Sequence, residues 1–197
     1  IDKAIFEGLF GVVPGAPADA FVRRYNADLA NDFGNLLNRT VRMVDRYFDG
    51  RVPKASGELQ PVDQLLLNLR EGHAKHVEDA LQRVALHEIL IDLWKLVEEA
   101  NKYVQETAPW ELAKARKAGS AQAEQRLGTG LYNLGDVLRL LGYYLGPVMP
   151  TRAQELLTQL GLAPAPQADW QTETAVGSYP AGTLVRSGEV LFPKHER

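Results

Sequence analysis

Cysteine is absent from this chain of 197 residues, which excludes disulfide scaffolds, thiol catalysis and zinc sites built from cysteine. No apolar run approaches the roughly 18–20 residues that are needed to cross a bilayer, so we expect no membrane segment. The chain starts without a methionine and without a basic segment followed by an apolar one. These features predict a cytoplasmic protein and a piece of a longer polypeptide.

An excess of positive charge is also lacking, because the net charge is −3. This value argues against loose, charge-driven binding of nucleic acid, although it leaves room for a local basic site. Residues 21–54 hold seven basic and four acidic side chains, so this segment carries +3 and the remainder carries −6. The hydrophobic share of 45% and the charged share of 24% are typical of a globular protein. The sequence therefore combines a basic segment with an acidic globular body.

Apolar spacing predicts an all-α fold of five or six helices. The expected helices cover residues 19–49, 62 to about 87, a stretch ending at Pro109, a short segment up to Gly119, 121–145, and 150 to about 161. Periodicity does not place the break between the second and third of these. Thr151 and Gln154 have the spacing of a capping box at the start of the last helix.

The domain organisation follows from where glycine and proline gather. We expect an irregular N-terminal segment over residues 1–18, a helical domain over 19–162 and a C-terminal tail over 163–197. The tail is predicted to pack on the bundle or to reach toward a missing domain. Its short apolar pieces at 183–185 and 190–192 fit either short strands or extended packing segments.

Catalytic and metal-binding patterns find little support in this sequence. His73, His76 and Asp79 have helical spacing that could ligate a metal, but no third histidine supports them. We therefore interpret the histidines as solvent-facing, with no metal site. Gly-rich phosphate loops, nucleophile elbows and paired catalytic carboxylates are missing as well. We expect no catalytic residue, no cofactor and no enzymatic activity in this piece alone.

One polar stripe on the first helix is more informative. At about 100° per residue, Asn35, Arg39, Arg42 and Arg46 fall on one side, next to the apolar face formed by Leu29, Phe33, Leu36 and others. An amide and a guanidinium four residues apart suit the edge of an exposed base. The same stripe also fits the ordinary polar flank of an amphipathic helix.

Two tryptophans differ in their sequence context. Trp94 lies on an apolar helical stripe and is expected in the core. Trp110 follows Pro109 at a helix junction, where it could stack on an unpaired base and remain largely exposed, or could plug the gap between two helices.

Several motifs, taken together, resemble the anticodon-binding domain of bacterial methionyl-tRNA synthetases, a class Ia helix bundle. These motifs are RYNADLANDFGNLLNRT at 24–40, ANKY at 100–103, TAPWELAK at 107–114, PVMP at 147–150 and LFPK at 191–194. The resemblance extends over about residues 20–195. It leaves two alternatives open, the anticodon domain of another class I synthetase and a helical protein-interaction module without an RNA role.

The resemblance implies that Asn35 and Arg39 contact the first base of a CAU anticodon, while Trp110 stacks on it. Asn101 falls on a family position near the anticodon pocket, and we expect Arg42 and Arg46 to hold backbone phosphate. The implied partners are tRNA(Met) and the missing catalytic domain.

The parent enzyme would be a methionine–tRNA ligase that uses ATP, and the resemblance allows zinc in it. The family's ATP-binding signatures, His-Ile-Gly-His and Lys-Met-Ser-Lys-Ser, are absent from these 197 residues. Two further departures are Gln105, where the family has an acidic residue, and Lys194-His195, where it has Arg-Ile. The charge-based rejection of wrong tRNAs is therefore not carried over to Gln105.

Overall fold

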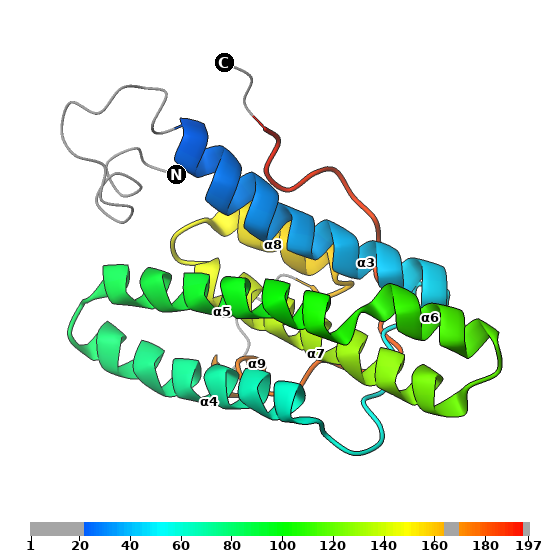
Figure 1. The fold of residues 1–197 in the computed structure, drawn as a ribbon. Helices are drawn as coiled ribbons and strands as arrows, with labels where there is room; N and C mark the ends of the chain where they lie inside the picture. Colours follow the sequence, from blue (N-terminus) through cyan, green and yellow to red (C-terminus); the bar gives the residue numbers. More distant parts are fainter. Residues whose placement is uncertain (1–21, 164–169, 195–197) are drawn as a thin grey trace.

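The computed structural model describes residues 22–163 and 170–194, and their fold is a bundle of helices (Figure 1). No strand occurs in these ranges, and a single antiparallel β-bridge joins Arg51 to Leu184. The all-α prediction is therefore confirmed. The expected irregular segment 1–18 lies outside the described residues. None of the helices in the described ranges is both long enough and apolar enough to cross a membrane.

The first long helix changes its hydrogen-bond register partway along. Residues 22–24 are α-helical, Tyr25–Gly34 form the π-helix η1, and Asn35–Phe48 form the α-helix α3. The buried residues of η1 are Asp28, Leu29, Ala30, Phe33 and Gly34. The described part of the expected helix over 19–49 is thus helical, and the π-helical register of η1 is a feature that the prediction did not address. The helix ends with Asp49 and Gly50 in the left-handed region.

The helices α4 (Pro61–Gln82) and α5 (Leu86–Thr107) form an antiparallel pair (Figure 1). Pro61 occupies the first helical position of α4, and Gln60 and Asp63 complete a capping box there. Three residues, 83–85, make the turn between the helices. Val84 at its centre has a φ of 57° although it is neither glycine nor asparagine. The turn contains neither glycine nor proline, so the sequence gives no indication of where the second helix ends and the third begins.

The central element of the bundle is α7 (Ala121–Leu145), which packs against α3, α4, α5, α6 (Pro109–Lys117) and α8 (Pro150–Gln159). Nearly all of its residues after Arg126 are buried. The side chain of Ser120 accepts a hydrogen bond from the Ala123 N–H and thereby caps its start. The capping box expected at Thr151 is not formed, because Pro150 is the first helical residue and the cap position falls on Met149.

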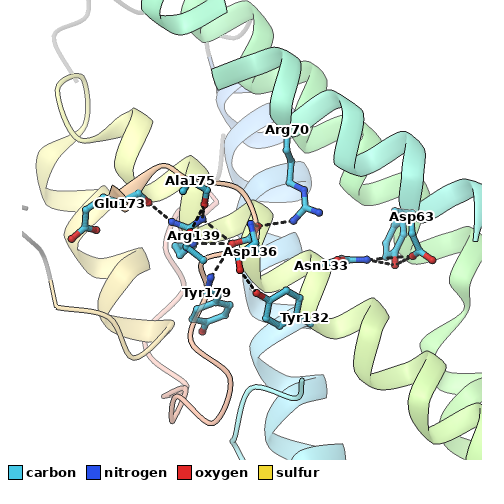
Figure 2. Close-up of polar contacts among 12 residues, drawn as sticks. Asp63, Arg70, Tyr132, Asn133, Asp136, Arg139, Glu173, Ala175 and Tyr179 are labelled. Carbon is cyan, nitrogen blue, oxygen red and sulfur yellow. Dashed lines mark hydrogen bonds and ion pairs between the residues drawn. The ribbon is translucent and has the colours of Figure 1, made fainter. Parts of the chain in front are cut away.

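A buried ionic cluster fastens the C-terminal tail to α7 (Figure 2). Asp136 is fully buried and accepts hydrogen bonds from Arg70 on α4 (2.6 Å) and from Arg139 (2.9 Å). The same carboxylate accepts the backbone N–H groups of Gly177 (2.7 Å) and Tyr179 (3.2 Å). A buried charge is stable only when it is paired and hydrogen-bonded in this way. The tail therefore belongs to the packed structure of the bundle.

The tail is not a pair of strands. Its described part contains a short helix, α9 (Trp170–Glu173), which apolar spacing did not predict. Val185, Leu191 and Phe192 are buried against the bundle without forming a ladder. Of the two sequence-based alternatives, extended packing segments are the one observed.

A second buried polar cluster ties α4 to α5 and α7 near the start of α4 (Figure 2). Asp63 accepts hydrogen bonds from Tyr103 (2.5 Å), Arg126 (2.6 Å) and Asn133 (3.3 Å). Burial acts to raise the pKa of Asp63, but the hydrogen bonds outweigh it and hold that pKa below its usual value.

The histidine interpretation requires one correction. His73 is buried, and its ring meets the Tyr144 ring edge-on with centroids 4.9 Å apart. Its position on α4 faces α7, on the same side as Leu66, Arg70 and Val77, so helical geometry places it inside. Burial lowers the pKa of His73 to about 4. His76 is partly exposed and pairs with Asp92 on α5.

Candidate nucleic-acid interface

Four polar residues of α3 line the side of the helix that borders its buried face. Asn35, Arg42 and Arg46 are exposed, whereas Arg39 is half-buried. Because α3 is a regular α-helix from Asn35 onward, the expected stripe is preserved despite the π-helix before it. Neither Arg42 nor Arg46 pairs with an acidic residue in the described part of the chain. The two guanidinium groups therefore present positive charge to solvent.

Arg39 makes a direct contact with α5. Its Nη2 donates a hydrogen bond to Asn101 Oδ1 over 2.5 Å, although the two residues are 62 apart in sequence. The core beneath this contact comes from Leu36 and from Val97 and Ala100 on α5, all of which are buried. Two of the residues that the resemblance singles out are thus brought together by the packing of α3 against α5.

Both N–H groups of the Asn101 side-chain amide are hydrogen-bonded within the protein. Asn101 Nδ2 donates to the carbonyl oxygens of Val97 (3.0 Å) and Asp32 (3.2 Å). An asparagine amide has only two N–H groups, so none is left for a ligand. Asn101 links α5 to the end of η1 and holds Arg39 through its oxygen.

The charge of Arg39 is partly offset by acidic neighbours. Burial raises the pKa of Asp32, the negative charge of Glu98 raises it further, and Arg39 lowers it. Arg39 Nε is buried without a hydrogen-bond partner among the described residues. The Asn101 contact uses one of the five N–H groups of the guanidinium, so its outer edge keeps donors that can meet a ligand.

Trp110 stands at the corner between α5 and α6. It is the second residue of α6, and 40% of its surface is exposed. Pro109 before it is buried and occupies the first position of the helix. Trp94, in contrast, is half-buried and meets the Phe33 ring edge-on at 6.2 Å. Trp94 therefore packs at the edge of the core rather than inside it, and Trp110 is less exposed than expected, because more than half of its surface is covered.

The far end of α6 is tied to the far end of α3. Arg116 donates from Nη1 to the carbonyl oxygen of Tyr47, and its guanidinium carbon lies 4.8 Å from the Phe48 ring centroid. Arg116 also pairs with Glu124 on α7 at 3.0 Å. This helix therefore bridges α5 and α3, the two elements that carry Asn101 and Arg39.

Sequence reasoning missed the residues that hold this arrangement together. Arg116 gave no signal, because a basic residue near a helix end is ordinary. Ala108, at the corner, also passed unnoticed, since alanine is the residue least expected to mark a turn. Asn101 was singled out as a site residue, but its contact with Arg39 was not expected. Within the described ranges, no group of three or more histidine, aspartate or glutamate residues is placed to hold a metal ion.

Several curated proteins with similar sequences are methionine–tRNA ligases. The chain is 41% identical over 176 residues to the methionine–tRNA ligase of Caldanaerobacter subterraneus subsp. tengcongensis, covering 89% of this chain and 26% of that protein. It is 38% identical over 178 residues to the methionine–tRNA ligase of Bacillus subtilis, covering 90% of this chain and 26% of that protein. The chain thus spans about a quarter of the length of the curated relatives it matches.

Solved structures give the same result. Methionyl-tRNA synthetase of Mycobacterium tuberculosis in its free state superposes with a TM-score of 0.79 at 32% identity, over 92% of this chain and 35% of that one. The same enzyme in complex with methionyl-adenylate gives a TM-score of 0.80 at 34% identity, over 89% of this chain and 33% of that one.

A family model matches most of the chain. The model described as the anticodon-binding domain of methionyl tRNA ligase matches residues 52–197, a range that contains Asn101 and Trp110. The α3 residues precede that range. The α3 residues do fall within the alignment to the Caldanaerobacter protein. That alignment spans 176 of the 197 residues, so any position of it includes α3. The chain therefore belongs to the family of anticodon-binding domains of methionyl tRNA ligases.

Proposed function

We propose that this chain recognises the CAU anticodon of methionine tRNA on behalf of a methionine–tRNA ligase. The observation that carries the proposal is the Arg39–Asn101 contact, which presents a guanidinium from α3 at a fixed position. A positioned guanidinium offers donors suited to the acceptor atoms on the edge of a cytosine. Asn35, one turn before Arg39 and exposed, adds an amide on the same side of the helix.

Trp110 supplies the second element of the proposed site. An exposed indole next to a helix start can stack on an unpaired base, and stacking is worth about 1–3 kcal/mol per base. Stacking alone does not select cytosine, because every base has a flat face. We therefore assign affinity to Trp110 and base selection to Arg39 and Asn35. Asn101 acts indirectly in this proposal, since it holds Arg39 and has no free donor.

Arg42 and Arg46 are proposed to contact backbone phosphate beside the anticodon. Their exposure and lack of acidic partners among the described residues support this role. Phosphate contacts position an RNA without reading its sequence. The net charge of −3 for the chain makes such local contacts important, because the molecule as a whole does not attract RNA.

The parent protein is proposed to join methionine to this tRNA with ATP in a catalytic part that lies outside this chain. The support comes from the names of the relatives and from the complex of the Mycobacterium tuberculosis enzyme with methionyl-adenylate. In that assembly, this domain would select the tRNA and the catalytic part would carry out the chemistry.

The test is equilibrium binding of an anticodon stem-loop RNA with CAU at two salt concentrations. We expect binding that weakens steeply as salt rises, because released counterions drive contacts to phosphate. The alternative, a helical module that binds protein through an apolar surface, predicts no measurable binding of the RNA. A double-stranded stem without the loop is the control, since it keeps the stem phosphates but offers no unpaired base.

A further inference from the structure

We propose that Ala108 is a positioning residue for Trp110, whose strained backbone fixes the angle between α5 and α6. This inference rests on the proposed function, because it assigns Trp110 a role in stacking on RNA. The backbone of Ala108 has φ 41° and ψ 62°, in the left-handed region. A β-carbon makes this region costly, so residues other than glycine, asparagine and aspartate seldom adopt it.

Pro109 prevents α5 from continuing as a right-handed helix through Ala108. A proline ring disfavours helical backbone angles in the residue before it and moves that residue toward the extended region. Ala108 nevertheless stays left-handed. Strained backbones of this kind persist where surrounding contacts hold them, and they concentrate at binding sites. Here the Ala108 N–H donates to Val104 O (3.2 Å), and the Ala108 carbonyl accepts from the N–H of Glu111 (2.9 Å).

The corner consists of one residue. Ala108 is at once the C-cap of α5 and the N-cap of α6, and no loop separates the two helices. The direction of α6 relative to α5 is therefore set by the φ and ψ of this one residue. Asn101, which holds Arg39, lies seven residues before Ala108, and Trp110 lies two residues after it. The same corner thus relates the proposed stacking platform to the proposed base-reading pair.

The other end of α6 is fixed independently. Arg116 joins α6 to the end of α3 through Tyr47 and Phe48. With both ends of the helix held, Trp110 is pre-positioned before any RNA arrives. Pre-positioning strengthens binding because less conformational freedom is lost on association. With a flexible corner the indole of Trp110 would still be present, but its orientation would have to be fixed when the RNA binds.

The test replaces Ala108 with glycine, which adopts the left-handed region without strain but also reaches many other conformations. We expect Ala108→Gly to keep or raise the denaturant midpoint and to weaken binding of the CAU stem-loop by about 2- to 10-fold. A residue with a merely structural role would not improve stability and impair binding together. Ala108→Asn should bind as the wild type does, because asparagine tolerates the left-handed region and keeps a β-carbon.

Val84→Gly is the matched control. Val84 also has a positive φ, 57°, and sits in the turn between α4 and α5, with 80% of its surface exposed. This substitution removes the same kind of strain away from Trp110, so stability should rise and RNA affinity should not change. Wild-type affinity in folded Ala108→Gly, or an equal loss of affinity in Val84→Gly, would overturn the inference.

A spectroscopic measurement tests directly whether Ala108 orders the Trp110 side chain, independently of stability and of RNA binding. With Trp94 and Trp170 replaced by phenylalanine, the fluorescence anisotropy of Trp110 reports the freedom of its side chain. We expect lower anisotropy in Ala108→Gly and recovery in Ala108→Asn, including the case in which the glycine variant is less stable. Unchanged anisotropy would contradict the inference. If the wild type fails to bind the stem-loop, the proposed function fails, and this measurement still tests whether Ala108 orders Trp110.

Discussion

Trp110 is partly exposed at a helix corner, so removing its ring should weaken binding while the domain remains folded. We expect Trp110→Ala to lose about 1–3 kcal/mol of binding free energy for the CAU stem-loop. The domain should stay folded, but its thermal unfolding midpoint should fall, because more than half of the Trp110 surface is covered and loses its packing. Circular dichroism melting and RNA titration of the same preparation measure the two effects.

Trp94→Phe serves as the control for this prediction, since Trp94 packs against the core beside Phe33. It should keep RNA affinity near that of the wild type. If Trp110→Ala unfolds the domain instead, the side chain is a plug between helices and the stacking role is wrong.

Arg39 and Arg46 lie on the same side of α3 but are proposed to do different work. Arg39→Ala should cost about 1–3 kcal/mol on the CAU stem-loop and relax the preference for cytosine at the first anticodon position. Arg46→Ala should weaken all stem-loops about equally and reduce the salt slope by about one. Titrations of CAU and UAU stem-loops at two salt concentrations separate the two patterns. Equal losses on both RNAs for Arg39→Ala would remove it from base recognition.

At the scale of single elements, the packing of α3 depends on its buried leucines. Leu36 is fully buried, as its apolar spacing predicts, and Leu36→Ala should cost about 2–5 kcal/mol of unfolding free energy. Chemical denaturation measures this loss as a lower midpoint. The adjacent exposed residue gives the control, since Asn35→Ala should change stability by no more than about 0.5 kcal/mol. Similar midpoints for the two variants would mean that the buried face of α3 is misassigned.

The contact between α4 and α7 should make stability depend on pH. Burial lowers the pKa of His73 to about 4, below the unfolded value near 6.5, so the unfolded state binds more protons between these values. Stability from the neutral ring is complete above pH 6.5 and falls as the pH drops toward 4, by up to about 3 kcal/mol. His73→Phe keeps a ring against Tyr144 and should flatten this part of the pH profile.

His76 provides the comparison, because the sign of its effect is opposite. Its hydrogen bond to Asp92 raises the pKa of His76, so the stability it contributes is present at low pH and is lost as the pH rises through the folded pKa. His76→Gln should therefore lower stability on the acid side only. If the slope between pH 6.5 and 4 survives in His73→Phe, another group causes it.

Most of the helices could be predicted from the sequence, because their boundaries coincide with proline, glycine and the spacing of leucines. Pro61, Pro109 and Pro150 each occupy the first position of a helix, and Gly161 follows the last residues of α8 with a φ of 74°. The register of η1 could not be predicted, since apolar spacing does not distinguish i→i−4 from i→i−5 hydrogen bonds. The turn at Val84 could not be predicted either, because it lacks the glycine, proline, asparagine or aspartate that usually marks a turn.

The residues of the candidate site came from the resemblance and remain a prediction, whereas the contacts between them come from the structure. The resemblance supplied Asn35, Arg39, Asn101 and Trp110, and all of them lie on or beside the elements expected. The contact between Arg39 and Asn101 depends on how α3 and α5 pack, which a single sequence does not specify. His73 was misplaced for a related reason, because its spacing matches both the polar and the buried side of α4 until the neighbouring helix is known.

At the scale of the whole molecule, the chain consists of one bundle whose tail is fastened to its core through Asp136. This attachment lies on α7, the central helix, and α7 also supports α6 and α3. The proposed RNA-binding residues are therefore presented by elements that share one rigid support. The chain spans about a quarter of the length of its relatives, and the proposed function assigns recognition of tRNA to this quarter.

The central claim is that the intact domain distinguishes the first base of the anticodon. The measurement that tests it most directly is a set of titrations of the wild-type chain with four stem-loops that differ only at that base. The account predicts tightest binding to CAU and a loss of about 1–3 kcal/mol for each of the other three bases, because each leaves the donors of Arg39 without their matched acceptors. Equal affinity for all four RNAs would contradict it.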